Sequence, residues 1–175
     1  AGGAVAYAYS NSTGIDNVKA FGTVTATSIN STLYVGGLVG EMGYTNVARG
    51  TALGSVTAVT ESSAYAGGLV GYYYGSNAGY FVSTSTASGT VRVDSFSGYV
   101  GGLVGQMSAG AVLQSSASGN VEATDVRNQS SSHYTGGLVG YFDGNQNMSD
   151  STATGQVIGR YMVGGLVGYY GSSGQ

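Results

Sequence analysis

The sequence contains no proline, no cysteine and no tryptophan, and it has few charged side chains. The lack of proline suits β-strands that are paired on both sides, because every backbone N–H can donate to a neighbouring strand. The lack of cysteine does not by itself indicate the redox compartment. Charged residues make up 7% of the chain, against a usual share of about 25%. This scarcity is expected if equivalent residues of a repeat lie over one another, because a repeated charge would face its own copy.

Several protein classes are excluded by what else is missing. The chain has five Lys and Arg residues and a net charge of -3, so it lacks the basic face that binds nucleic acid. No apolar run approaches the about 20 residues of a transmembrane helix. The composition is not that of a disordered chain, which combines low hydrophobicity with high charge. No signal peptide is visible, and Ala1 is consistent either with cleavage of one or with a boundary inside a longer chain.

The sequence does have two short motifs that repeat in phase. Gly-Gly-Leu-Val-Gly begins at Gly36, Gly67, Gly101, Gly136 and Gly164, and residues 2–6 are a degenerate copy. The intervals between copies are 34, 31, 34, 35 and 28 residues. Ala-x-Gly-x-Val alternates with this motif, and seven residues before its glycine stands an apolar residue: Ile15, Val47, Val82, Val112 or Met148. Periods of this length are typical of solenoids, in which each repeat stacks on its neighbours.

We therefore predict an all-β fold, a parallel β-solenoid (β-helix) of about five coils with a period of about 28–35 residues. Residues 1–175 form one repeat domain, with coils at approximately 2–35, 36–66, 67–100, 101–135 and 136–163 and a terminal half-coil at 164–175. Equivalent residues of successive coils should lie about 4.7–4.8 Å apart.

Alternation along each strand predicts which residues face the core. In the Ala-x-Gly-x-Val strand the small residues face inward. In the second strand we place Leu38 inside and Val39 outside, because position 42 is greasier than position 41 in most copies. The predicted core columns are Leu38, Leu69, Leu103, Leu138 and Leu166, and Gly22, Gly54, Gly89, Gly119 and Gly155.

This facing leaves an exposed apolar stripe, which usually marks an interaction surface. With the opposite facing, the stripe contains leucine and tyrosine instead. With the facing that we predict, the stripe consists of Val39, Val70, Val104, Val139 and Val167, flanked by Val35, Ala66, Val100, Thr135 and Val163.

The repeats resemble the GLUG motif of microbial surface proteins, which is named for its Gly-Leu-hydrophobic-Gly core. The resemblance covers essentially the whole chain and includes residues 37–40, their copies, and alternating segments such as 153–157. It implies an extracellular β-solenoid of a kind often linked to adhesion, and it implies no catalytic residue. The first copy departs from the pattern at Ala4 and Ala6, which suggests adaptation to a terminal coil.

Few residues suggest chemistry. His133 is the only histidine, and a hydrolase would pair it with Ser130, Ser131 or Ser132 and with Asp125. The more economical interpretation is a flexible polar loop between residues 123 and 135, and we predict no enzymatic activity.

A calcium loop is the one cofactor that the sequence suggests. The candidate ligands are Asp143, Asn145, Asn147 and Asp150, although the glycine and the closing glutamate of such loops are missing, so an Asx-rich turn explains the same residues. No other cofactor is expected.

Other features suggest surface roles. Residues 72–74 are three tyrosines that, with Tyr80, could stack on sugar rings or form an ordinary aromatic ladder. Columns of threonine and serine resemble those of ice-binding solenoids, but Lys19, Phe21 and Leu53 interrupt them. Four Asn-x-Ser/Thr sequons, at Asn11, Asn30, Asn128 and Asn147, fall in predicted loops and are candidate glycosylation sites or coincidences of a Ser/Thr-rich chain.

The expected role is structural: a subunit of an extracellular filament, or the shaft of a cell-surface adhesin. The alternative is a glycan-binding surface module, and an ice-binding protein is a further one. The expected partners are other copies of the chain and, for the alternative, glycans or a host or cell surface.

Neither end of the sequence has a helix, a proline or a charge cluster that could cap a coil. We therefore predict head-to-tail contact between residues 164–175 of one copy and residues 1–9 of the next. If the chain is a piece of a longer array, the caps lie outside it. The residues predicted to assemble are Gly2, Gly3, Val5, Tyr7, Gly165, Leu166, Val167 and Tyr169.

Overall fold

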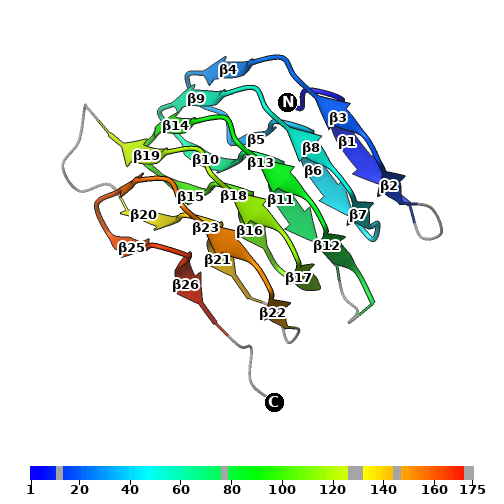
Figure 1. Cartoon of the computed structure of the whole chain (residues 1–175). Helices are drawn as coiled ribbons and strands as arrows, with labels where there is room; N and C mark the ends of the chain where they lie inside the picture. The colour runs from blue at the N-terminus through cyan, green and yellow to red at the C-terminus, as the bar shows by residue number, and fades with distance from the viewer. Residues whose placement is uncertain (11–13, 76–78, 126–131, 144–146, 172–175) are drawn as a thin grey trace.

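The computed structural model describes residues 1–10, 14–75, 79–125, 132–143 and 147–171. These residues form short β-strands that wind into a stack of coils, and the neighbouring strands of successive coils pair in parallel (Figure 1). They contain no helix with the length and apolar character needed to cross a membrane. The prediction of an all-β parallel β-solenoid is therefore confirmed.

Each coil contributes one strand to each of five parallel sheets, which we name after their first strand. The β1 sheet contains β1 (Val5–Tyr9), β6 (Val39–Gly43), β11 (Val70–Tyr74), β16 (Val104–Met107), β21 (Val139–Phe142) and β26 (Val167–Tyr170). The β2 sheet contains β2 (Ile15–Asp16), β7 (Val47–Ala48), β12 (Phe81–Ser83), β17 (Ala111–Leu113) and β22 (Met148–Ser149). The β3 sheet contains β3 (Lys19–Ala20), β8 (Thr51–Ala52), β13 (Thr86–Ala87), β18 (Ser116–Ala117) and β23 (Thr152–Ala153).

The two remaining sheets complete the coil. The β4 sheet contains β4 (Val24–Ser28), β9 (Val56–Thr60), β14 (Val91–Asp94), β19 (Val121–Thr124) and β24 (Val157–Ile158). The β5 sheet contains β5 (Leu33–Gly36), β10 (Ser63–Gly67), β15 (Ser97–Gly101), β20 (Ser132–Gly136) and β25 (Met162–Gly164).

The repeated motifs pair with their own copies, as the period predicts. The apolar anchors form one column of the β2 sheet, in which Val47 pairs with Val82 and Val82 with Val112. The core divides into two parts. One lies among the β1, β2 and β3 sheets and contains the leucines; the other lies between the β4 and β5 sheets and contains mostly valine and alanine.

The prediction that Val39 and its counterparts face outward as an exposed stripe is wrong. Val39 and Leu38 are both fully buried, and so are their counterparts in the next three coils. The strand ends at Gly36, bends at residues 37–38 and starts again at Val39. At this corner the N–H groups of Leu38 and Val39 both donate to the carbonyl oxygen of Leu69, each at 2.9 Å. Alternation holds only within one strand, so a corner lets two successive side chains face the core.

The flanking column is also buried, which contradicts the exposed stripe. Val35, Ala66, Val100 and Thr135 are inaccessible to solvent, and only Val163 in the last coil is exposed. These residues face the second core, because the β5 sheet packs against the β4 sheet on that side.

The glycine column has a different role from the predicted one. A Cβ atom on Gly89 would lie 2.1 Å from the carbonyl oxygen of Gly54, and one on Gly54 would lie 2.0 Å from that of Gly22. The absent side chain therefore points at the preceding coil, not into the core, and glycine is needed for the coils to approach. Three glycines of the column are buried, whereas Gly22 is exposed and Gly155 half-buried.

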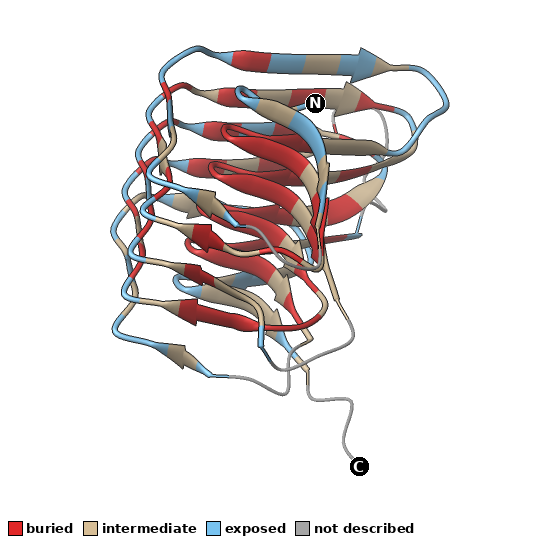
Figure 2. Cartoon of the chain, turned by 90° about the vertical axis from the view of Figure 1, so that its right-hand side faces the viewer, coloured by how far each residue is buried: buried red, intermediate tan, exposed pale blue. Residues whose placement is uncertain are grey.

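The end coils differ from the interior because no described coil covers them. Leu38, Leu69, Leu103 and Leu138 form the predicted buried column, but Leu166 is 39% exposed, so its assignment to the core is wrong. Figure 2 shows the same contrast, with buried segments concentrated in the interior coils. The burial of an apolar side chain thus depends on the coil stacked next to it.

A corner between the β2 and β3 sheets places a non-glycine residue in the left-handed region in each coil. The residues at this position are Asn17, Arg49, Thr84, Gln114 and Asp150, with φ between 48° and 54°. Just after the corner, serine hydroxyls link the coils: the N–H of Ser85 donates to Ser115 Oγ, and the N–H of Ser115 donates to Ser151 Oγ, each at 3.1 Å.

Candidate functional site

Tyrosine side chains line one side of the rod in two adjacent columns. In the β5 sheet, Tyr65 pairs in register with Tyr34 and Tyr99, and Tyr99 pairs with Tyr134. The positions on either side of these tyrosines are buried, except Leu33, which is half-buried, so the intervening tyrosines point outward. In the β1 sheet the matching outward column is Glu41, Tyr72, Gln106, Tyr141 and Tyr169.

The rings of the two columns touch. Along the β5 sheet, ring centroids are 5.0 Å apart for Tyr65 and Tyr99 and 5.2 Å apart for Tyr99 and Tyr134. Between the columns, Tyr99 and Tyr141 are 4.8 Å apart. We call the set that these contacts connect the tyrosine belt. It comprises Tyr34, Tyr65, Tyr72, Tyr99, Tyr134, Tyr141, Tyr161 and Tyr169, and it continues through Tyr74 to Tyr44, Tyr9, Tyr80 and Tyr7.

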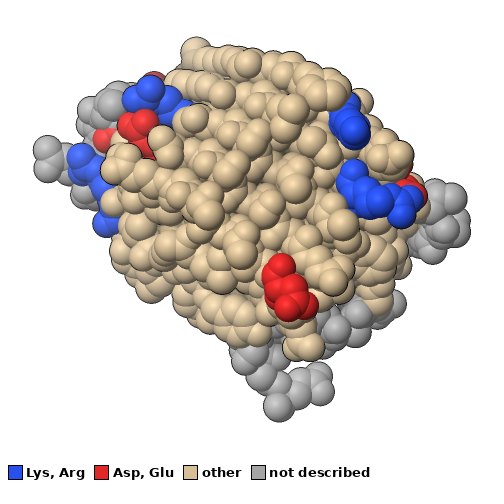
Figure 3. Space-filling view, viewed as in Figure 1, with Lys and Arg blue, Asp and Glu red and all other residues tan. Residues whose placement is uncertain are grey.

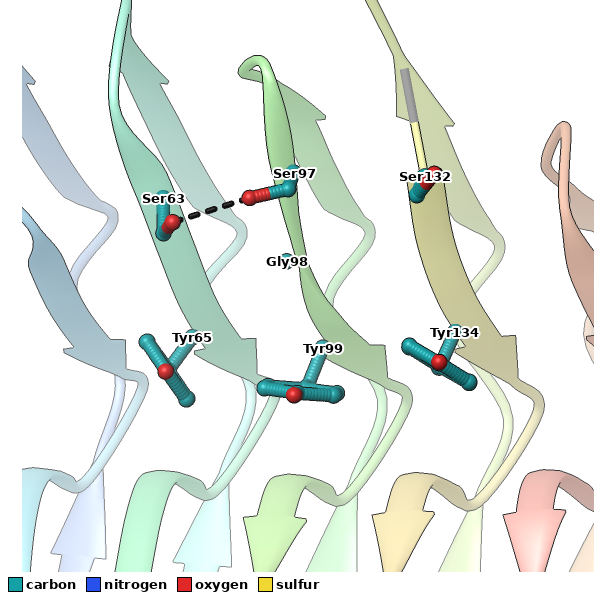
Figure 4. Close-up of a pocket in the computed structure, with 7 residues that line it drawn as sticks. All are labelled: Ser63, Tyr65, Ser97, Gly98, Tyr99, Ser132 and Tyr134. Carbon is teal, nitrogen blue, oxygen red and sulfur yellow. Dashed lines mark hydrogen bonds between the residues drawn. The ribbon is translucent and has the colours of Figure 1, made fainter. Parts of the chain in front are cut away.

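A groove of about 130 Å³ lies beside the belt on the outer face of the β5 sheet. Its walls are a row of serines, Ser63, Ser97 and Ser132, and a row of tyrosines, Tyr65, Tyr99 and Tyr134, with Gly98 between them. Figure 4 shows the Tyr99 ring edge-on, so that one ring face is turned toward the serine row. Ser63 Oγ and Ser97 Oγ are 2.8 Å apart and share a hydrogen bond. The groove therefore combines aromatic faces with hydroxyl donors and acceptors.

Burial raises the pKa of three phenol groups in the centre of the belt, those of Tyr65, Tyr99 and Tyr141. Partial burial raises the pKa of Tyr65 to about 12, and the neighbouring Tyr99 and Tyr34 add to the effect. Burial is also the largest cause of the raised pKa of Tyr99 and of Tyr141. Of the described residues that line the groove, none carries a charge at neutral pH. The groove is suited to an uncharged ligand.

The three consecutive tyrosines do not act together, as a joint sugar platform would require. Tyr73 is fully buried, and its hydroxyl donates to the Thr45 carbonyl oxygen at 2.9 Å. Tyr72, Tyr74 and Tyr80 remain half-buried at the surface. The groove between Tyr99 and Ser97 was missed in the sequence, although a tyrosine stands two residues before four of the Gly-Gly pairs and was a signal for it.

A second uncharged surface is formed by the hydroxyl columns of the β3 sheet. Thr51 pairs in register with Thr86, and Ser116 with Thr152, as predicted. Figure 3 shows that Lys, Arg, Asp and Glu side chains lie around the margin of this face, not over its centre. Lys19 ends the column, and Phe21 and Leu53 are 66% and 45% exposed beside it, so the hydroxyl array is interrupted as the sequence indicated.

His133 lies in the core and not on a flexible loop, which corrects that interpretation. It belongs to β20, is inaccessible to solvent, and its Nε2 is 3.0 Å from Ser95 Oγ. Because the Ser95 hydroxyl donates to the Ser97 carbonyl oxygen, Nε2–H is the donor to Ser95. Nδ1 has no hydrogen-bond partner among the described residues. Burial is the largest cause of the lowered pKa of His133, and the Asp125 charge opposes it. Ser130 and Ser131 lie outside the described residues, and Ser132 is exposed.

The calcium candidates are only partly described. Asn145 lies outside the described residues, and the Asn147 carbonyl oxygen accepts from the N–H of Val112. Within the described part of the chain, no three His, Asp or Glu side chains are grouped to hold a metal ion. Two sequon asparagines, Asn30 and Asn147, are exposed, whereas Asn11 and Asn128 lie outside the described residues.

The predicted assembly residues lie on the two end coils. Gly2, Val5 and Val167 are half-buried, and Gly3, Gly165 and Leu166 are exposed. Tyr7 is 53% exposed and Tyr169 is half-buried. Each end therefore presents a strip of partly covered apolar residues.

Comparisons with known proteins give one match among curated proteins. Halomucin from Haloquadratum walsbyi (strain DSM 16790 / HBSQ001) is 36% identical over 168 residues, which cover 89% of this chain and 2% of halomucin. The chain therefore corresponds to a small part of that protein. No protein-family model matches the chain, so the resemblance to the GLUG repeat stays a prediction. No solved structure matches it.

Proposed function

We propose that this chain is a structural β-solenoid of the cell surface, acting either as a filament subunit or as part of an adhesin shaft. The observation that carries the proposal is the contrast between interior and end coils. Leu103 is fully buried, whereas its counterpart Leu166 is 39% exposed, and Val100 is fully buried, whereas Val163 is 47% exposed. An end coil covered by another coil of the same repeat buries these residues and pairs its free strand edge.

The cover can come from another copy or from further coils of one polypeptide. In a filament, the β26 end of one copy contacts the β1 end of the next, and such a heterologous contact does not close on itself. In a shaft, flanking repeats supply the coils. The extracellular location is supported by the match to halomucin, whose name is that of a mucin. Exposed sequons at Asn30 and Asn147 suit a glycosylated surface protein.

Light scattering on matched variants tests the filament. Leu166→Asp places a charge on the end coil, whereas Leu53→Asp places one on the side of the rod, where Leu53 is 45% exposed. We expect mass to grow with concentration for the unmodified chain and for Leu53→Asp, and to remain that of a monomer for Leu166→Asp. Monomers of the unmodified chain at every concentration would contradict the filament.

Immunogold labelling of intact cells tests the surface location, which both forms of the proposal share. Gold on unpermeabilised cells is the expected result. Labelling only after permeabilisation would rule out the filament and the shaft alike. No catalytic role is proposed, because the single histidine is buried against Ser95.

A further inference from the structure

We infer that the groove between the serine row and the tyrosine row binds an extended, uncharged polysaccharide that lies parallel to the rod axis. The serine row is Ser63, Ser97 and Ser132, and the tyrosine row is Tyr65, Tyr99 and Tyr134. This role is separate from the structural one and does not depend on filament formation.

The orientation of the ligand follows from the register of the sheet. Ser63 pairs with Ser97, and Tyr65 with Tyr99, so both rows run from coil to coil, perpendicular to the strands. Coils repeat every about 4.8 Å, which is close to the advance of one pyranose ring in an extended chain. Each coil can therefore offer one serine and one tyrosine to one sugar.

The chemistry of the two walls selects a sugar. Pyranose rings have apolar C–H faces and polar hydroxyl edges, and binding grooves pair such ligands with aromatic faces and a few placed polar groups. The Tyr99 ring turns a face toward the serine row, as Figure 4 shows. Ser97 Oγ and Ser63 Oγ lie on the opposite wall and can both donate and accept hydrogen bonds.

The lack of charge favours a neutral polymer over an acidic one. No lysine or arginine is among the described residues lining the groove, so a uronate or sulfate group would lose water without gaining an ion pair. The Tyr65 phenol does not supply charge either, because burial and its tyrosine neighbours raise its pKa to about 12.

The length of the groove sets the length of the ligand. Its lining comes from β10, β15 and β20, which belong to three successive coils. We expect affinity to rise from a disaccharide to a trisaccharide and then to level off. A contact made by the end of a sugar chain alone would show no such dependence.

Isothermal titration of the intact chain tests the inference, with neutral oligomers of β-1,4-glucose, β-1,4-mannose and α-1,4-glucose from two to six units and with trigalacturonate as the acidic comparator. At least one neutral series should bind, and more tightly than trigalacturonate. Tyr99→Ala should weaken binding at least about tenfold, as expected for a central aromatic contact. Tyr7→Ala is the control, because Tyr7 is 53% exposed and lies outside the groove.

A second variant and a direct readout guard against a folding defect in Tyr99→Ala. Ser97→Ala removes the hydroxyl with little change in side-chain size, and it should also weaken binding. In the unmodified chain, ring carbon chemical shifts of Tyr65, Tyr99 and Tyr134 should move on titration while those of Tyr7 stay fixed. Absence of binding by all three neutral series, equal loss in Tyr7→Ala, or tighter binding of trigalacturonate would overturn the inference. Self-association that Tyr99→Ala abolishes, with no sugar bound, would instead assign the groove to contact between rods.

Discussion

Replacing Leu103 by alanine should destabilise the interior of the rod far more than the same change at Leu166. Leu103 is fully buried in the leucine column between Leu69 and Leu138, and the coils on both sides hold the backbone in place. Removing the buried carbons loses about 2 kcal/mol of transfer free energy. The cavity that remains adds to this loss, so the total falls in the range of about 2–5 kcal/mol. Leu166 is 39% exposed and leaves no closed cavity, so its replacement should cost about 1 kcal/mol.

Urea unfolding followed by far-UV circular dichroism measures both values by linear extrapolation. The measurements belong at concentrations where light scattering shows monomers, because stacking of copies would bury Leu166. Similar denaturant slopes in the two variants and the unmodified chain would indicate that the same surface is exposed on unfolding. Equal losses at Leu103 and Leu166, or a loss below about 1 kcal/mol at Leu103, would refute the argument that stacked coils create the buried column.

Three further predictions test other parts of the account. Gly89→Ala should lower the melting temperature strongly, because the added Cβ would lie 2.1 Å from the Gly54 carbonyl oxygen. Gly22→Ala is the control and should have little effect, because nothing lies within 4 Å of a Cβ at that position. Equal effects of the two variants would contradict the close approach of the coils. Thr84 is β-branched with φ of 49°, so Thr84→Asn should raise the free energy of unfolding by about 1 kcal/mol, and a decrease in urea unfolding would argue against a left-handed corner. Burial holds the pKa of His133 below its unfolded value, so the unfolded state binds the proton more readily and the free energy of unfolding falls as the pH drops below about 6.5. The free energy of unfolding of the unmodified chain should therefore decline from pH 7 to 5.5, and His133→Gln should remove most of that decline.

The sequence was sufficient to predict the parallel stack and its register. The regular alternation of Gly-Gly-Leu-Val-Gly with Ala-x-Gly-x-Val aligns each motif with its own copy, and the pairing of Val70 with Val39 and of Ala87 with Ala52 confirms this alignment. Register is strongly determined here because a slip by one residue would move buried residues to the surface.

Which side chains point into the core was harder to predict, because the alternation of inward and outward side chains applies only inside one strand. Alternation over one continuous strand puts Leu38 and Val39 on opposite faces, but the bend at residues 37–38 separates two strands, and both side chains face the core. A pair of glycines permits such a corner without specifying it. The groove was not predicted for the same reason. Its two walls form because Ser97 and Tyr99 point outward from β15, a strand that ends at this corner.

The position of His133 also could not be derived from local sequence. Polar residues precede it, which favours a loop, whereas its burial comes from the β4 sheet packed opposite β20. Such contacts join residues far apart in the chain, as the Ser95–His133 hydrogen bond does. A tertiary contact of this kind overrides local preference.

Electron cryomicroscopy of the purified chain at increasing concentration tests most directly whether coils of different copies stack. The account predicts rods longer than one chain, with a meridional repeat of about 4.7–4.8 Å continuing across the junctions between copies. Leu166→Asp should shorten these rods to single chains, whereas Leu53→Asp should not. Rods of single-chain length at every concentration, or long assemblies in which the chains lie side by side without that continuous repeat, would contradict end-to-end stacking.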